Sequence, residues 1–430
     1  MSQEKVKPQS HQALGFWGCW SLSVGVMIGS GVFLLPSVLA PYGLLSFGGW
    51  LLSAGGAILI ALVLGRLAGR TERTGGPFAF AHDAFGDLPG FLVGWGYWIS
   101  VWIATPTIAI AFVGYLTIFI PGLSDQPVWQ AIIALGLIWA LTLNSMRGAK
   151  DFALTQIIMT VLKLVPLFVI IGLGLLAGQS ENLPEPNPSE GSLFSVLPTV
   201  ALLTMWAFLG METGTIPAGD VRNPERTIPK AVVIGTITVA SVYIASTAAV
   251  MMLVPADQLA QSTSPFADAA RGLGQWGPSM IAIGALIATA GSMNGNIFIS
   301  GQLPMALSLD KLAPKFLANL NPAGAPKISL LLGSTLSSVL LVTNYSRGLI
   351  GAFTFFLMMS TLTALIPYLV SSIAELRYSW KTKRAWAFIA LVAAIFSIYA
   401  IYGSGLDVIF WGAVLMVIGV PVFYLGRQKP

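Results

Sequence analysis

Charged residues are scarce in this chain of 430 residues. Only 9% of them are Asp, Glu, Lys or Arg, whereas 55% are hydrophobic. A soluble protein of this length has about a quarter of its residues charged. Too few charges are present to cover a surface in water, so a soluble globular fold is excluded and a lipid-embedded protein is indicated.

Cysteine and histidine are almost absent. Cys19 is the one cysteine, which excludes a disulfide framework and a zinc site made of four cysteines. The two histidines, His11 and His82, are far apart in the chain, and no cluster of carboxylates accompanies them. No glycine-rich phosphate-binding motif is present, so ATP coupling is not indicated. We therefore expect neither a metal nor another cofactor.

Two other classes of membrane protein have little support. A serine nucleophile at Ser30 would need an adjacent base, and both histidines fall near or beyond the predicted membrane surface. Channel filters are built from rings of charge or of carbonyls, and no such pattern is present. An intramembrane enzyme and a channel are thus remote alternatives.

Long apolar runs dominate the sequence. A helix needs roughly 20 apolar residues to cross the hydrocarbon core, so the chain has room for about twelve spans with short loops. Glycine and proline within such runs are tolerated in membrane helices. The predicted spans are 14–41, 44–68, 88–120, 127–146, 151–177, 192–219, 229–254, 278–306, 327–343, 349–375, 385–402 and 407–426.

The basic residues predict the orientation of these spans. All but three of the 22 lysines and arginines fall on one side, in loops or in the two termini. Arg271 and Arg347 fall on the opposite side, and Lys163 lies within a span. Because cytoplasmic loops are rich in Lys and Arg, both termini are predicted to be cytoplasmic. The bases are scattered and form no stripe, which argues against nucleic acid as a partner.

Two charged residues are predicted deep inside the membrane, Lys163 in the fifth span and Glu212 in the sixth. Charged groups at this depth are costly and usually functional. A helix-locking ion pair or a snorkelling side chain is the structural alternative. Lys163 lies roughly 20 Å along its helix from the nearer end, which is too far for easy snorkelling.

Two segments have the composition of interrupted helices. Residues 25–36 and 206–217 each place small, flexible residues in mid-span and a proline just beyond them. One such run alone could serve close helix packing. Interrupted segments at corresponding places in the first and sixth helices are instead typical of a transporter binding site.

The chemistry of an interrupted helix suits a zwitterion. Unwinding frees N–H groups at the N-terminus of a half-helix, where they can hold a carboxylate. Freed carbonyl groups can accept hydrogen bonds from an ammonium group. An amino acid carries both groups.

Six motifs carry a family resemblance. They are GSGVFLLP at 29–36, GGPFAFA at 75–81, WAFLGME at 206–212, NPERTIP at 223–229, SPF at 264–266 and PYL at 367–369. With them the chain resembles the amino acid–polyamine–organocation superfamily. It is most similar to the basic amino acid/polyamine antiporter branch, which includes the arginine/agmatine and putrescine/ornithine antiporters. The motifs run from the first to the tenth span, so the resemblance covers most of the chain.

The resemblance implies a fold of two inverted five-helix repeats (LeuT-like) with two extra helices, often dimeric, that works by alternating access. The corresponding regions are a cytoplasmic tail at 1–13, the first repeat at 14–177, an external loop at 178–191, the second repeat at 192–375, and the last two helices with a short tail at 376–430.

The resemblance also implies roles for individual residues. Ser30 and Gly31, next to Met27, would receive the substrate carboxylate. The backbone of Trp206, Ala207, Phe208 and Leu209 would receive the amino group, and Trp206 would cover the substrate as an aromatic gate. Glu212 would be the acidic residue that responds to pH in this branch.

Three positions depart from the arginine-specific members. Asn296 stands where those members have an aromatic residue that stacks on the guanidinium, and Thr105 stands in place of an asparagine. Both changes weaken a cation–π clamp and indicate a different or smaller substrate. Lys163 stands where sodium-coupled relatives bind an ion, so it argues against sodium coupling. It allows proton coupling, because burial disfavours the charged form of an amine. We expect it to bond unwound carbonyls near Gly25 and polar groups such as Ser292.

Other polar and aromatic residues are expected to have ordinary roles. The aromatic residues of the third span are interpreted as packing residues or interface anchors, and they are Trp95, Tyr97, Trp98 and Trp102. The alternative for Trp102 is that it faces the site, one turn from Thr105. His82 and Asp83 are interpreted as loop residues, and Tyr115 has no assigned role.

We therefore expect an all-α integral membrane protein of about twelve helices in the cell inner membrane. It would be a secondary active transporter of amino acids or related amines, working as an exchanger or a proton-coupled permease. The alternative is a proton-coupled transporter of neutral amino acids. The expected partners are the small-molecule substrate, the lipid bilayer and a second copy of the chain.

Overall fold

The fold is described from a computed structural model, which describes residues 15–70, 76–147, 152–189, 191–215, 221 and 223–427. At positions 22, 30–31, 152–162, 214–215 and 224 the structure describes the backbone only. The α-helices are α1 (Phe16–Met27), α2 (Leu35–Leu39), α3 (Leu45–Ala68), α4 (Pro77–Phe85), α5 (Asp87–Leu116), α6 (Pro127–Ser145), α7 (Phe152–Ala177), α8 (Leu193–Met205), α9 (Pro224–Leu253), α10 (Ala256–Leu259), α11 (Pro265–Ala269), α12 (Trp276–Leu309), α13 (Lys327–Asn344), α14 (Gly348–Ser379), α15 (Arg384–Tyr402) and α16 (Leu406–Gly426).

The helical membrane architecture is confirmed for the described part of the chain. Nine of its segments are long and apolar enough to cross a membrane. One of them, Lys327–Ser379, contains both α13 and α14. The apolar stretches Phe16–Met27 and Lys163–Ala177 are helical but shorter.

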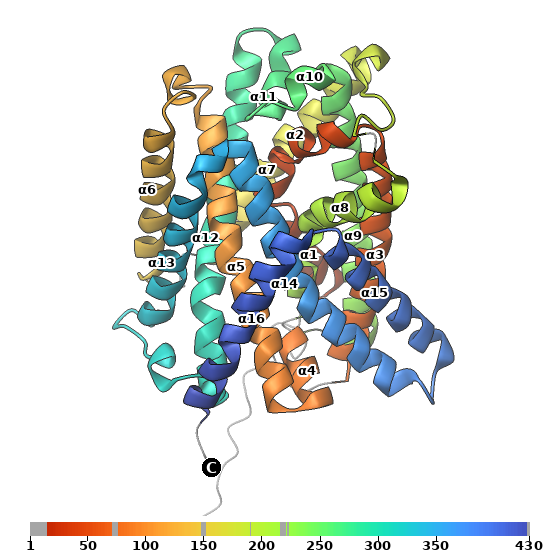
Figure 1. Cartoon of the computed structure of the whole chain (residues 1–430), viewed down its shortest axis with the longest axis vertical. Helices are drawn as coiled ribbons and strands as arrows, with labels where there is room; N and C mark the ends of the chain where they lie inside the picture. Colours follow the sequence, from red (N-terminus) through yellow and green to blue (C-terminus); the bar gives the residue numbers. More distant parts are fainter. Residues whose placement is uncertain are drawn as a thin grey trace, which may run out of the picture.

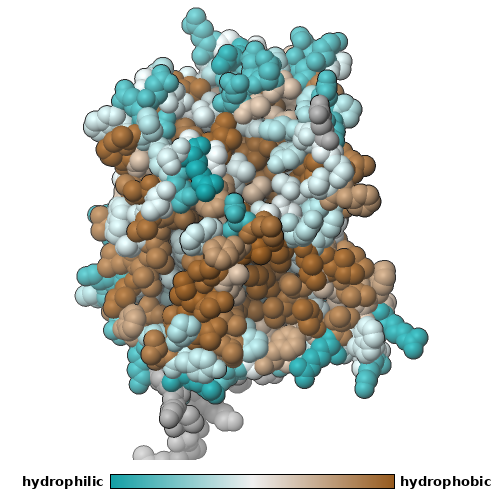
Figure 2. All heavy atoms as spheres, in the orientation of Figure 1, coloured by the Kyte–Doolittle hydropathy of each residue, from teal (hydrophilic) through white to brown (hydrophobic). Residues whose placement is uncertain are grey.

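The surface agrees with a lipid environment. On the face in Figure 2, hydrophilic residues gather at both ends of the long axis, and hydrophobic residues cover much of the area between them. Exposed side chains include Phe388, Phe410 and Val417, which are 61–67% exposed. Contiguous apolar surface of this kind is expected to face lipid.

Helix α5 lies at the centre of the bundle. It packs against α12 and α14, and it is buried over most of its length although Pro106 interrupts its hydrogen bonds. Helices α10 and α11 lie at one end of the molecule, and α4 and the end of α16 lie at the other (Figure 1). Small residues allow close packing elsewhere, since a Cβ on Gly49 of α3 would lie 2.2 Å from Val200 of α8.

Two sequence interpretations are wrong in detail. His82 and Asp83 lie on the short helix α4 instead of in a loop, and His82 Nε2 lies 3.1 Å from Asp87 Oδ1. The tenth span does not end at Glu375, because α14 continues to Ser379.

Glu375 is therefore a third charged group in the helical body, and it is fully buried. Its carboxylate pairs with Arg66 of α3, at 2.7 Å from Nε, and with Arg70 just beyond the end of that helix, at 3.1 Å from Nη1. These contacts hold α3 and α14 together at the end of the molecule where α3 terminates.

Candidate functional site

Helix α1 is interrupted where the sequence predicts it. It ends at Met27, and Ile28 and Gly29 leave the helical conformation before the 3₁₀ helix η1 (Ser30–Phe33) begins. The backbone of Ser30 and Gly31 thus starts a new helical segment, while the side chain of Ser30 lies outside the described part of the structure.

Helix α8 is interrupted as well. It ends at Met205 and is followed by η5 (Trp206–Phe208) and η6 (Met211–Thr215). Leu209 between them is extended and Gly210 has a φ of +96°, a conformation that favours glycine because it has no Cβ. The chain therefore changes direction beside Glu212.

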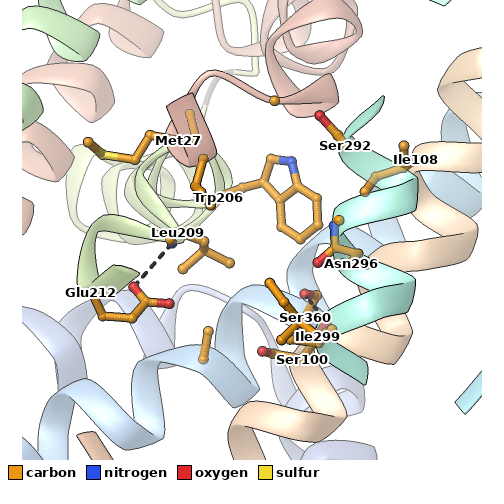
Figure 3. A pocket seen from close by; sticks show the side chains of 18 of the residues that line it. Met27, Ser100, Ile108, Trp206, Leu209, Glu212, Ser292, Asn296, Ile299 and Ser360 are labelled. Atoms are coloured by element: carbon orange, nitrogen blue, oxygen red, sulfur yellow. Dashed lines mark hydrogen bonds between the residues drawn. The ribbon is translucent and has the colours of Figure 1, made fainter. Parts of the chain in front are cut away.

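A cavity of about 300 Å³ lies between the two interruptions. Its walls come from α1, α5, α7, α12 and α14 as well as from the interrupted segments. Figure 3 shows the indole of Trp206 inside this space, between Leu209 and Asn296. The predicted site residues that line it are Met27, Lys163, Trp206, Ala207, Leu209, Glu212 and Asn296.

Two predicted residues, Thr105 and Phe208, do not line this cavity. The hydroxyl of Thr105 donates to the Val101 carbonyl at 3.3 Å, and the preceding residue, Ala104, faces the cavity instead. The ring of Phe208 packs on Trp50 with a centroid distance of 6.0 Å. One residue along a helix is a rotation of about 100°, and α5 is apolar on all sides, so its sequence does not indicate which face turns inward.

Glu212 is the acidic residue of the cavity wall among the described residues. It is fully buried, and the hydroxyls of Tyr97 and Tyr368 donate to its two oxygens. The Gly210 N–H donates to Oε2 at 3.1 Å, which is the dashed line in Figure 3. The carboxyl group thereby connects α5, α14 and the turn between η5 and η6.

Lys163 lies on the α7 wall of the cavity. Its side chain is 2% exposed and its ammonium donates to the Gly25 carbonyl, as predicted. Ser292 of α12 also lines the cavity, but its hydroxyl has no hydrogen-bond partner in the described structure. The last turn of α1 is further held by Tyr243, whose hydroxyl donates to the Met27 carbonyl at 2.7 Å.

Several lining residues were not predicted. Tyr97 is not a packing residue, because its hydroxyl reaches Glu212. Tyr97, Val101, Ala104 and Ile108 all line the cavity, and their spacing of three or four residues defines one face of α5. If Tyr97 is interpreted as a polar residue of the site, this spacing predicts which face of α5 lines the cavity. Ser100 and Ser360 line the cavity too, and Ser360 donates to the Ser100 carbonyl at 2.7 Å.

Tyr115 lies further along α5, where it contacts η1 and α11. Its buried hydroxyl donates to the Phe33 carbonyl at 2.7 Å and accepts from the Phe266 N–H at 3.2 Å. It therefore joins α5 to η1 and α11. Tyr97 and Tyr115 are separated by about 27 Å along α5, and the cavity-lining residue Ile108 lies between them.

A cavity at the meeting of two interrupted helices, inside a multi-pass helical membrane protein, is the arrangement of a secondary transporter. The family model described as amino acid permease matches residues 14–425. The chain belongs to this family, which confirms the resemblance found in its motifs.

Several transporters are similar to this chain over nearly its whole length. A protein of Bacillus subtilis (strain 168), provisionally named an arginine/ornithine antiporter, is 31% identical over 95% of each chain. The putrescine transporter PotE of Escherichia coli (strain K12) is 30% identical over 93% of this chain and 92% of its own. A cadaverine/lysine antiporter of the same strain is 30% identical over 90% of this chain and 88% of its own. The chain is thus a secondary active transporter of the membrane and not an enzyme.

Proposed function

We propose that this transporter exchanges cationic amino acids and aliphatic amines across the bacterial inner membrane by alternating access. The observation that carries the proposal is the Glu212 carboxyl group, buried in the cavity wall beside the interruption of α8. A carboxylate forms charge-assisted hydrogen bonds with an ammonium group, and these are about twice as strong as neutral ones. The relatives named for putrescine, cadaverine and lysine support the same substrate class.

The interrupted segments would hold the rest of the substrate. We assign the carboxylate of an amino acid to the backbone at Ser30 and Gly31, and its amino group to the carbonyls from Trp206 to Leu209. The position of the Trp206 indole inside the cavity supports its role as a gate over the substrate.

A proton-coupled transporter of neutral amino acids is less well supported. That alternative rested on Thr105 and Asn296, and Thr105 does not line the cavity. Asn296 does line it, but the names of the relatives do not favour a neutral substrate.

The finer architecture also belongs to the proposal. Counting α13 and α14 separately and adding the shorter α1 and α7 supports twelve spans. The two interruptions, at corresponding places in 14–177 and 192–375, support inverted repeats. The loop arginines and lysines support cytoplasmic termini. A homodimer is proposed on the family resemblance alone.

Exchange in proteoliposomes tests this function. We expect saturable uptake of radiolabelled lysine, ornithine or putrescine that requires internal substrate, because an exchanger returns across the membrane only when loaded. The same amines should compete with one another, and neutral amino acids should compete poorly. Uptake of neutral amino acids driven by a proton gradient alone would establish the alternative, and uptake of neither class would contradict the proposal.

The hydrogen bonds of Tyr115 join α5 to η1 and α11, so removing them should change the balance between the state open on the α11 side and the state closed there. Tyr115→Phe removes two hydrogen bonds worth about 0.5–1.5 kcal/mol each, so we expect the state open on the α11 side to become about tenfold more populated. Cys19 is the one native cysteine, and it is buried. A membrane-impermeant thiol reagent added on that side should therefore modify an introduced Ile108→Cys about tenfold faster in the Tyr115→Phe background.

The matched control for this change is Tyr345→Phe. Tyr345 donates to Gln130 Oε1 at 2.9 Å in a peripheral contact between η10 (Tyr345–Arg347) and α6. The Tyr345→Phe variant removes a tyrosine hydroxyl that contacts neither η1 nor α11, so it should leave the labelling rate unchanged. Equal labelling rates with and without Tyr115→Phe would show that Tyr115 does not stabilise the state closed on the α11 side.

A further inference from the structure

Arg347 is an unusual cation for its position. Arg271 and Arg347 are the two basic residues predicted on the sparsely charged side of the membrane. Arg271 is neutralised by Asp268, with Nη2 2.6 Å from Oδ1. Arg347 has no ion pair within the described ranges, and its guanidinium lies 4.2 Å from the centroid of the Phe355 ring.

Arg347 lines a recess of about 610 Å³, separate from the central cavity. One wall is the start of α14, with Gly351, Thr354, Phe355 and Met358, and the other is the turn from α15 to α16. Helix α14 has 32 residues and α16 has 21. At the helical rise this is about 48 Å against about 32 Å.

The floor of the recess carries a charge of opposite sign. Asp407 lies in the first turn of α16 and lines the recess. It is exposed and has no ion-pair partner among the residues that the structure describes. One open site thus offers an unpaired guanidinium and an unpaired carboxylate, which suits a ligand with an anionic oxygen group and a nearby ammonium group.

The surface below the recess is apolar. Leu406, Phe410 and Trp411 of α16 are 85%, 61% and 51% exposed. On the face in Figure 2, hydrophilic residues extend from the upper end down to the edge of a broad hydrophobic area. A recess that carries charged groups and borders lipid-facing surface is a place where a headgroup can bind while its acyl chains follow the helix.

We propose that this recess binds a phospholipid with a primary ammonium headgroup, of the phosphatidylethanolamine type. Arg347 binds the phosphate, Asp407 accepts hydrogen bonds from the ammonium, and the acyl chains lie along the exposed face of α16. A free amino acid shares the ammonium and an anionic group, but it has nothing to cover the apolar residues beside the recess. A second copy of the chain would also cover these apolar residues. It would then have to present an acidic group to Arg347 and a basic group to Asp407 from its own surface.

Lipid binding to the purified full-length chain tests the proposal without relying on transport. Native mass spectrometry would follow titration with phosphatidylethanolamine, its mono- and dimethylated forms, and phosphatidylcholine with the same acyl chains. Losing one charge-assisted contact changes affinity by about tenfold or more, so we expect phosphatidylethanolamine to bind about tenfold more tightly than phosphatidylcholine. The affinity should fall with methylation, because each methyl group removes one N–H of the ammonium and the trimethylated headgroup has none left to donate to Asp407.

The variants separate the two charges. Asp407→Asn should abolish the preference for phosphatidylethanolamine, and Arg347→Gln should weaken both lipids by about tenfold. Arg271→Gln is the matched control, since it removes the paired base on the same side. Unfolding temperature in detergent confirms that each variant is folded.

Three results would overturn the inference. The first is a preference for phosphatidylethanolamine that survives in Asp407→Asn, or an affinity for both lipids that stays unchanged in Arg347→Gln. The second is displacement of the lipid by saturating free lysine, which would make the recess a vestibule for substrate. The third is a change of oligomeric state in the variants with lipid selectivity intact, which would make it an interface between copies.

Discussion

Glu212→Gln is expected to reduce exchange of cationic substrates by about a hundredfold. Glutamine has nearly the same shape but no charge, so the substrate ammonium loses a contact of about 1.5–3 kcal/mol. In the wild-type chain the hydroxyls of Tyr97 and Tyr368 donate to one carboxylate oxygen each. In the variant one of these hydroxyls would face the amide NH2 group, which is itself a donor. The two effects together correspond to about two powers of ten in rate.

Initial rates in proteoliposomes measure this effect for lysine, putrescine and a neutral amino acid. Tyr97→Phe and Tyr368→Phe are the matched variants, because each removes a hydroxyl and leaves the carboxyl group in place. We expect them to lower the rate by about tenfold, as one hydrogen bond to a charged group is lost in each. Cationic exchange at the wild-type rate in Glu212→Gln would show that this carboxyl group does not serve the substrate.

Lys163→Met is expected to lose at least about tenfold in exchange rate, because the variant removes the donor to the Gly25 carbonyl. That carbonyl lies in the last turn of α1, just before the helix is interrupted. A buried acceptor left without its partner costs about 1–3 kcal/mol. The cost falls on the segment that carries Met27 and leads to Ser30, so substrate binding and the conformational change should both suffer.

Lys163→Gln separates the effect of losing the hydrogen bond to Gly25 from the effect of losing the positive charge. Glutamine is shorter but keeps a donor, so partial exchange should return, while any response to an imposed proton gradient should disappear. Sodium should have no effect on the wild-type chain, whose lysine is expected to replace the ion. The exposed Lys230→Gln is the control and should behave as wild type. Stimulation by sodium in the wild-type chain, or a full proton response in Lys163→Gln, would contradict these roles.

Local composition predicted the two broken helices and two charged residues at membrane depth. Glycine and small polar residues before Pro36 and Pro217 weaken the helix wherever the rest of the chain lies, and α1 and α8 are interrupted there. Lys163 and Glu212 stood out because charge is costly at membrane depth. The contact between Lys163 and the Gly25 carbonyl was expected from the family resemblance, and the structure contains it.

The inward face of each helix could not be predicted in the same way. An amphipathic helix shows which side is buried, but α5 is apolar all round and gives no such signal. Thr105 was therefore expected at the site where the neighbouring Ala104 lies, and Tyr97 was taken for a packing residue although it binds Glu212. Glu375 was missed because the sequence did not show how far α14 extends.

The sequence by itself determined that the chain lies in lipid, where its helices break and that Lys163 and Glu212 lie at membrane depth, because these depend on the local cost of polar groups and of glycine in a membrane. The tertiary structure alone decided which side chains meet. Tyr97 and Tyr368 reach one carboxyl group from helices far apart in the chain, Tyr115 joins η1 to α11, and Arg347 shares a recess with Asp407. Such contacts depend on the rotation and length of packed helices, and a helix apolar on every side encodes neither in its own residues.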